Sequence, residues 1–256
     1  MYWQDRIAEA QTAISDKNIK QINKQLSKYY SNAAKKIIKD FEAVYDKVLA
    51  QQAAGQEITP ALLYRLDSYW ELQAQLRNEL QKLGEKEVVA LTKAFELNFF
   101  EVYYSLNIEG AKAFSTIDKQ AAQQLINSIW VADGKSFSQR IWDNTERLAE
   151  TLNEELVNCV VAGKKTTELK QILQQRFNVS YSAADSLART EIAHIQTQAA
   201  QQRYKDYGIQ QVEILADEDE RRCDVCGKLH GKQYPINGAI PIPAHPRCRC
   251  CVVPVI

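Results

Sequence analysis

The chain of 256 residues carries 32 basic and 32 acidic side chains and is 45% hydrophobic, which is the composition of an ordinary globular protein. No apolar run approaches the roughly 18 residues that span a bilayer, and the first residues lack the features of a secretory signal, so neither a membrane protein nor a Sec-exported protein is expected. Zero net charge argues against a protein that works mainly by coating nucleic acid, because phosphate affinity scales with the number of Lys and Arg contacts.

The chain divides by composition into a long first part and a short tail. One proline, Pro60, and one cysteine, Cys159, precede residue 223, whereas five prolines and five cysteines lie in the last 34 residues. Because proline removes a backbone donor and clashes inside a helix, the first part is predicted to be helical and the tail to be built differently.

Apolar periodicity and capping signals place the helices along the first part. The predicted helices are 18–53, 60–83, 86–107, 118–130, 137–162, 167–176 and 181–207. Glycines are expected to end several runs in the left-handed conformation, because glycine has no Cβ to clash there. These glycines are Gly55, Gly84, Gly110, Gly134, Gly163 and Gly208.

The first long helix carries a one-sided basic face. Its lysines fall within about 100° of arc, at about 100° per residue. A solvated surface explains such a face, and contact with DNA or an acidic partner is the alternative, so the pattern leaves both interpretations open. The lysines are Lys17, Lys20, Lys24, Lys28, Lys35 and Lys39.

The predicted helix 86–107 is rich in aromatic residues, with Phe95, Phe99, Phe100, Tyr103 and Tyr104 close together. Core packing explains most of them. Adjacent residues on a helix point about 100° apart, so these side chains cannot all face one core, and a protein interface on one side is the alternative.

The tail carries the strongest chemical signal. Cys223 and Cys226 are two residues apart, and a second group of candidate ligands starts at His245 and continues with Cys248 and Cys250. Zinc takes four nitrogen or sulfur ligands in a tetrahedron, and a two-residue gap lets both sulfurs of a tight turn reach one ion. We expect a structural zinc site with three of its ligands from Cys223, Cys226 and His245, and the fourth from either Cys248 or Cys250.

Other interpretations of these cysteines stay open. Disulfides need an oxidising compartment, for which the sequence gives no export signal, and unligated packing cysteines are a further alternative. A catalytic zinc would keep an open coordination position, which a full set of soft ligands does not favour. The His-x-Glu and Pro-Cys-x-x-Cys pattern of zinc deaminases is absent, because Ile195 and Gln196 follow His194 and Arg222 precedes Cys223.

Short extended segments surround the cysteines and are predicted as strands 211–215, 232–236 and 251–255. Such strands are too few to build a core alone, so bound zinc is expected to supply folding free energy to the tail. The fold class that follows is mainly α, with a multi-helix N-terminal region and a small C-terminal α+β domain that ends in a zinc-stapled β-ribbon.

Several motifs occur in a specific order in the last 120 residues. They are Phe137 to Trp142, Ala188-Arg189-Thr190-Glu191, Asp219-x-Arg221-x-Cys223, Leu229-His230-Gly231-Lys232, and the proline-rich approach to His245-Pro246-x-Cys248-Arg249-Cys250. In this order they resemble the phage head-morphogenesis family, the minor capsid proteins similar to phage Mu protein F. The resemblance covers residues 136–256, and the first 135 residues match only as a helical region of the expected length.

The sequence departs from the family pattern in places. The family commonly has two prolines before the histidine, but here they are separated as Pro241 and Pro243, and Cys251 is an additional thiol. The chain ends at Ile256, just after the cysteines, so the toxin or enzymatic extension of some relatives is not expected.

The resemblance implies a virion protein that associates with the portal inside the procapsid and aids head assembly and DNA packaging or ejection. Implied partners are the portal protein, the major capsid or scaffolding protein, and viral DNA. The implied location is the host cytoplasm during assembly and then the inside of the capsid. Residues 1–135 are expected to form a portal or capsid interaction region, and residues 136–256 the Mu F-like domain, with helices in 137–207 and the zinc ribbon in 209–256.

A structural role is expected for the family motif at Arg189, Thr190 and Glu191, together with Asp219 and Arg221. Consecutive helical residues point in different directions, so Arg189, Thr190 and Glu191 cannot form one catalytic cluster by themselves. We expect Arg189 and Glu191 to tie their helix to the zinc ribbon through charge-assisted hydrogen bonds. No enzymatic activity is expected, and the alternative is a DNA-binding ejection factor or a nuclease-like enzyme, for which Glu191 would be the candidate catalytic residue.

Overall fold

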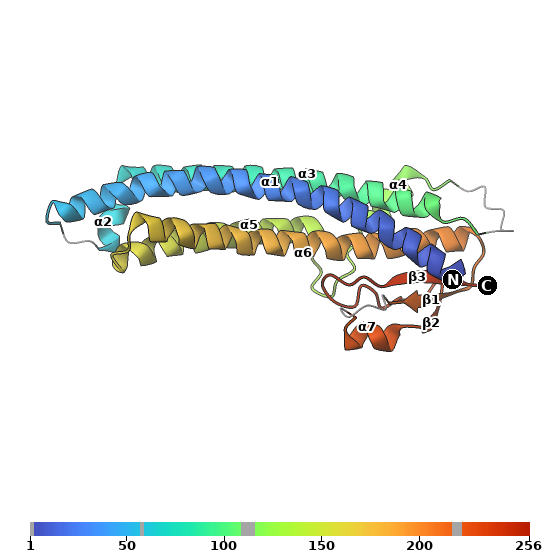
Figure 1. The fold of residues 1–256 in the computed structure, drawn as a ribbon. Coiled ribbons are helices and arrows are strands. Elements are labelled where there is room, and N and C mark those ends of the chain that lie inside the picture. The colour runs from blue at the N-terminus through green and yellow to red at the C-terminus, as the bar shows by residue number, and fades with distance from the viewer. Residues whose placement is uncertain (1–2, 57–58, 109–115, 217–221) are drawn as a thin grey trace. The chain divides into compact units, whose positions relative to one another are not determined.

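The computed structural model describes residues 3–56, 59–108, 116–216 and 222–256. Its elements are drawn in Figure 1. In chain order they are α1 (Trp3–Ala53), α2 (Pro60–Tyr64), α3 (Asp67–Ser105), α4 (Lys119–Ile126), α5 (Phe137–Val161), α6 (Thr166–Asp206), β1 (Gln211–Leu215), α7 (Asp224–Leu229), β2 (Gln233–Pro235) and β3 (Cys251–Val255). The predicted mainly α fold with a small C-terminal sheet is confirmed.

The predicted strands are close to the observed ones. Segments 211–215 and 251–255 are β1 and β3, and segment 232–236 shortens to β2. Both outer strands pair antiparallel with β1, in the order β2-β1-β3. None of the helices that the structure describes combines the length and apolar character needed to cross a membrane.

The predicted helix break at Gly84 is wrong, because α3 runs through it. A Cβ placed on Gly84 would lie 2.5 Å from a ring carbon of Trp142 on α5. This glycine therefore permits close helix packing instead of ending a helix. The predicted left-handed conformation is confirmed at Gly55, Gly134, Gly163 and Gly208, and Gly110 lies outside the described residues.

The predicted break before residue 181 is also wrong, because α6 is continuous from Thr166 to Asp206. Its buried residues keep a helical spacing through Ser180, so one uninterrupted helix buries one continuous stripe. The residues of this stripe are Leu169, Leu173, Phe177, Ser180, Ala184 and Ala188.

Helix α1 starts at Trp3, earlier than the predicted residue 18. In its first turns the buried stripe is polar, with Gln11, Ser15 and Asn18 taking the positions that apolar residues occupy further along. Hydrophobic periodicity could not detect such a stripe.

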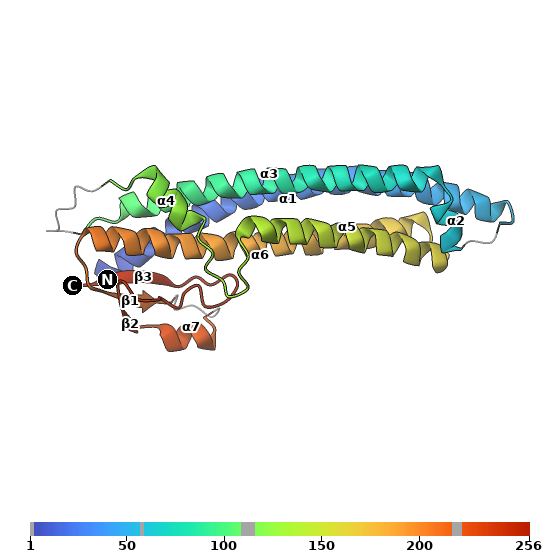
Figure 2. The ribbon, with the colours of Figure 1, turned by 180° about the vertical axis from the view of Figure 1, so that it is seen from behind.

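The chain forms two compact units, each assembled from separate segments. Unit 1 contains Met1–Asn23, Ala90–Phe137 and Ser186–Ile256, and unit 2 contains Lys24–Val89 and Ser138–Asp185. Within unit 2, segments of α1, α3, α5 and α6 run alongside one another (Figure 2). Buried Tyr45 of α1 donates its hydroxyl to the carbonyl oxygens of Cys159 and Lys164, at 2.8 and 2.7 Å, which holds the connection between α5 and α6.

Unit 2 also contains a buried polar layer, which we define as Tyr30, Glu87, Asn144 and Ser180. Tyr30 donates its hydroxyl to Glu87 Oε2 at 3.0 Å, and Asn144 Nδ2 donates to the Tyr30 hydroxyl and to the Ser180 carbonyl oxygen. Each residue comes from a different helix, so the layer fixes the order and register of α1, α3, α5 and α6 within this unit.

In unit 1 the sheet packs on helices through a shared backbone acceptor. The carbonyl oxygen of Val252 in β3 accepts hydrogen bonds from Gln11 of α1 at 2.9 Å and from the buried Tyr204 hydroxyl of α6 at 3.2 Å. Gln201 Nε2 donates to the carbonyl oxygen of Ile236, just after β2. The C-terminal half of α6 therefore forms the support on which the tail is built.

Candidate metal centre

The first two candidate ligands lie on a tight turn at the start of α7. Cys223 is the N-cap residue of α7, and its sulfur accepts a hydrogen bond from the backbone N–H of Cys226 at 3.4 Å. The backbone N–H of Gly227 donates to the Cys223 carbonyl oxygen at 2.9 Å, which closes the turn. The two-residue spacing thus directs both sulfurs to the same side, as a metal knuckle requires.

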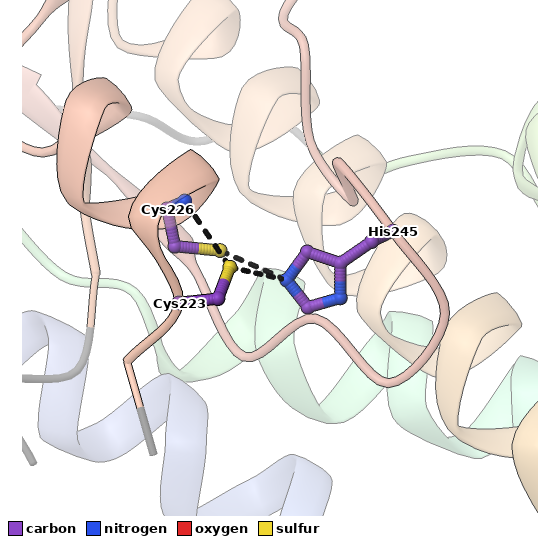
Figure 3. Close-up of side chains that lie close together, drawn as sticks. All are labelled: Cys223, Cys226 and His245. Atoms are coloured by element: carbon purple, nitrogen blue, oxygen red, sulfur yellow. Dashed lines mark hydrogen bonds between the residues drawn. The ribbon is translucent and has the colours of Figure 1, made fainter. Parts of the chain in front are cut away.

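His245 reaches these two sulfurs from the loop before β3 (Figure 3). Its Nε2 lies 3.3 Å from Cys223 Sγ and 3.1 Å from Cys226 Sγ. Its other ring nitrogen, Nδ1, lies 2.8 Å from the carbonyl oxygen of Pro246. A carbonyl oxygen only accepts, so Nδ1 carries a proton, which leaves Nε2 as the ring nitrogen that could offer a lone pair to a metal ion beside the sulfurs.

Cys226 also belongs to a second group of donors, with Cys248 and Cys250. The sulfurs of Cys226 and Cys248 are 3.7 Å apart, and the donor atoms in each group lie within 4.8 Å of one another. All five predicted donors are therefore brought together, as two overlapping triads that share Cys226.

The spacing of these atoms can be compared with that of a tetrahedral zinc site. Zn–S bonds of about 2.3 Å and a Zn–N bond of about 2.0–2.1 Å place sulfurs about 3.8 Å apart and nitrogen about 3.6 Å from each sulfur. The observed contacts, 3.7 Å between sulfurs and 3.1–3.3 Å from nitrogen to sulfur, are close to these values. Thiols and an imidazole at this spacing can hold a soft metal ion, and the structure places them as two groups of three, with no four of the five donors all within 4.8 Å of one another.

The thiols differ in how easily they lose a proton. The N–H of Cys226 lowers the pKa of Cys223, and a hydrogen bond from the Cys250 thiol lowers the pKa of Cys248 to about 5. Burial raises the pKa of Cys226 to about 12. A buried thiolate at Cys226, the residue shared by both triads, therefore needs a compensating positive charge, which a bound metal ion would supply.

Cys251, the additional thiol, is buried in β3 and belongs to neither triad. Cys250 lies just before β3, and Cys251 is its first residue. The remaining cysteine, Cys159, is buried in α5, as its place in a helical segment suggests.

The Arg-Thr-Glu motif lies on α6, and its residues have different surroundings. Thr190 Oγ1 accepts a hydrogen bond from the backbone N–H of Arg247, between His245 and Cys248, at 3.1 Å. Glu191 is buried, and its Oε2 accepts a hydrogen bond from Trp130 Nε1 at 2.9 Å. Arg189 is half-buried on the same helix, and Asp219 and Arg221 lie outside the described residues.

The indole of Trp130 also contacts a histidine of α6. Trp130 stacks on His194 with the ring centroids 4.3 Å apart and the planes 9° from parallel. Burial lowers the pKa of His194 to about 4, so this imidazole is neutral near neutral pH. His194 follows Glu191 by three residues and so lies on the same side of α6.

The lysines of the basic face differ in their contacts. All six are exposed, and Lys17 forms an ion pair with Glu101 of α3, with 2.7 Å between Nζ and Oε1. Lys17 and Lys20 lie in unit 1, and Lys24, Lys28, Lys35 and Lys39 lie in unit 2.

The described chain thus belongs to the class of helical proteins that end in a small sheet around a Cys/His centre. Residues 150–253 match the family described as Phage Mu protein F like protein, which confirms the resemblance found in the sequence motifs. This match suggests a head-morphogenesis family for the C-terminal part of the chain.

A comparison with curated proteins finds a more distant relative. The chain is 24% identical over 204 residues to a protein of Enterococcus faecalis named NAD(+)--arginine ADP-ribosyltransferase EFV. The match covers 70% of this chain but only 42% of that relative's length. No match to a solved structure was found.

Proposed function

We propose that this chain is a minor capsid protein that associates with the portal inside the procapsid and aids head assembly and DNA packaging or ejection. The observation that carries the proposal is the family match over residues 150–253, a segment that contains all five candidate metal ligands. In this proposal residues 1–135 are the portal or capsid interaction region, and residues 136–256 are the Mu F-like domain.

The metal of the proposed centre is zinc in a structural role. The donors are thiols and one imidazole, the ligand types of closed structural zinc sites. Beside the centre, β2 has three residues and α7 has six, so these elements bury little surface of their own. Bound zinc would hold Cys223 and Cys226 of the turn against the loop of His245 and Cys248, and so supply folding free energy to the tail.

Exposed aromatic residues on α3 support a protein partner. Trp70 is 59% exposed and Tyr104 is 48% exposed, although each large ring would gain free energy from burial. Aromatic residues are enriched at the centres of protein interfaces. Portal, major capsid and scaffolding proteins are the partners that a head-morphogenesis role implies.

A structural role is proposed in preference to an enzymatic one. The named activity of the Enterococcus faecalis relative belongs to a protein of which this chain matches 42%, so it does not by itself assign an activity here. Glu191, the candidate catalytic carboxylate, is buried and accepts a hydrogen bond from the Trp130 indole, an arrangement that suits a packing role.

A DNA-binding ejection factor remains the second candidate, because Lys20, Lys24 and Lys28 are exposed on one side of α1. The two functions are separated by measuring binding of the purified chain to portal oligomers and to duplex DNA across a salt series. The minor capsid role predicts portal binding that persists at moderate salt, with weak DNA binding that salt removes.

The lysine face is tested with a variant in which Lys20, Lys24 and Lys28 are changed to Gln. The matched control changes Lys47, Lys86 and Lys93 to Gln, because these residues are also exposed. Portal binding unchanged in both variants supports the proposal. Tight DNA binding by the wild type, lost in the first variant and kept in the control, would instead establish the DNA-binding function.

A further inference from the structure

Helix α6 contacts the metal loop through the hydroxyl of Thr190. The loop runs from His245 to Cys248, and both of these end residues are candidate ligands. Pro246 and Arg247 lie between them, and of these two only Arg247 has a backbone N–H. The Arg247 backbone N–H donates to Thr190 Oγ1 at 3.1 Å, across 57 positions of sequence.

Arg247 needs such a contact because of its backbone conformation. Its φ is +62°, in the left-handed region that residues with a Cβ rarely adopt. Backbone of this kind persists only where its surroundings hold it in place. Within the loop, the Cys248 N–H donates to the His245 carbonyl oxygen at 3.2 Å, so the turn at Arg247 brings the two ligand residues together.

Thr190 is itself held in the orientation that this bond requires. Its hydroxyl donates to the carbonyl oxygen of Ser186, one turn earlier in α6, at 2.7 Å. With its proton used in that bond, Oγ1 presents a lone pair to the Arg247 N–H. The helix is supported here by the neighbouring Glu191, which is buried and bonded to Trp130.

We propose that Thr190 is a positioning residue for the metal centre, which holds the turn at Arg247 so that His245 and Cys248 are arranged for metal binding before the ion arrives. The proposal rests on the metal centre described under the proposed function. It gives the middle residue of the Arg-Thr-Glu motif a physical role that requires no chemistry on a substrate. Residues that orient metal ligands through hydrogen bonds typically contribute about 10–100-fold to metal affinity.

The test compares zinc affinity of full-length variants in competition with a chromophoric chelator. Thr190→Val keeps the shape of the side chain but removes the acceptor, and is expected to weaken zinc binding by about 10-fold. Thr190→Ser keeps the hydroxyl and should restore affinity to near the wild-type value. Thr197→Val is the matched control, because Thr197 is buried in α6 and donates to the Ala193 carbonyl oxygen within the same helix, at 3.0 Å.

A second readout follows the bond itself. Amide hydrogen exchange at Arg247 in the metal-free chain should be faster in Thr190→Val than in the wild type, and unchanged in Thr197→Val. A general structural defect would instead lower thermal stability in both valine variants alike.

The outcomes separate this inference from the proposed metal centre. A wild-type chain that binds no zinc overturns both. A wild type that binds zinc while Thr190→Val binds it equally tightly overturns only the role of Thr190. Weakened binding in Thr190→Val, restored by Thr190→Ser and absent in Thr197→Val, supports the inference.

Discussion

At the scale of single residues, Gly84 shows how a local signal can be misinterpreted. Glycine usually ends a helix, but here it lies inside α3 under the ring of Trp142, where a Cβ would approach a ring carbon to 2.5 Å. The close packing of α3 against α5 therefore explains why a glycine is needed at position 84. The sequence of α3 alone cannot show this need, because it depends on Trp142 of α5. Trp142 is itself 39% exposed, so it covers the glycine from the outer side.

Gly84→Ala is expected to destabilise unit 2 by about 1–3 kcal/mol through overpacking, although alanine is the better helix former by about 1 kcal/mol. Urea unfolding measures the effect. In a double-mutant cycle, Trp142→Ala should remove most of the penalty, since the clashing ring is gone. A Gly84→Ala chain as stable as the wild type would show that the ring can move aside at no cost.

The metal ligands can also be tested residue by residue. Cys226 is shared by both donor triads, so Cys226→Ser is expected to abolish stoichiometric zinc binding. Cys251 is buried but belongs to neither triad, so Cys251→Ser should retain one zinc per chain. Elemental analysis of the purified, reduced chains decides the matter, and full zinc content in Cys226→Ser would contradict the proposed centre.

At the scale of elements, the buried polar layer of unit 2 makes its stability depend on pH. Burial raises the pKa of Glu87 from 4.5 to about 7, and its Oε1 has no hydrogen-bond partner among the described residues. The groups that face it from the other helices are the Tyr30 hydroxyl and, behind it, Asn144 and Ser180. None of these groups supplies a positive charge to the carboxylate.

The folded state binds the Glu87 proton more tightly than the unfolded state does. Its contribution to stability is therefore fully present below about pH 4.5 and is lost as the pH rises to about 7. The loss amounts to at most about 3.5 kcal/mol, at about 1.4 kcal/mol for each pKa unit. Urea unfolding at pH 5 and pH 8 should show a smaller pH effect for Glu87→Gln than for the wild type, and equal pH effects in both chains would contradict the buried protonated state.

At the scale of the whole molecule, composition and residue spacing predict the architecture better than they predict helix boundaries and long-range contacts. The concentration of prolines and cysteines in the tail predicted the division into helices and sheet, and the spacing of the cysteines and His245 predicted which side chains meet. The polar start of α1 and the continuous α6 were missed, because burial in tertiary contacts overrides periodicity and cap signals. The Thr190–Arg247 bond spans 57 positions, so no local pattern could indicate it.

The proposed function concerns where the chain acts, and one measurement addresses it directly. A localised cryo-electron microscopy reconstruction of the portal vertex, from procapsids assembled with and without this chain, shows whether it is bound there. We predict additional helical density in contact with the portal on the inside of the head, only in particles that contain the chain. Identical portal vertices in both preparations, with the chain absent from purified particles, would contradict a minor capsid role.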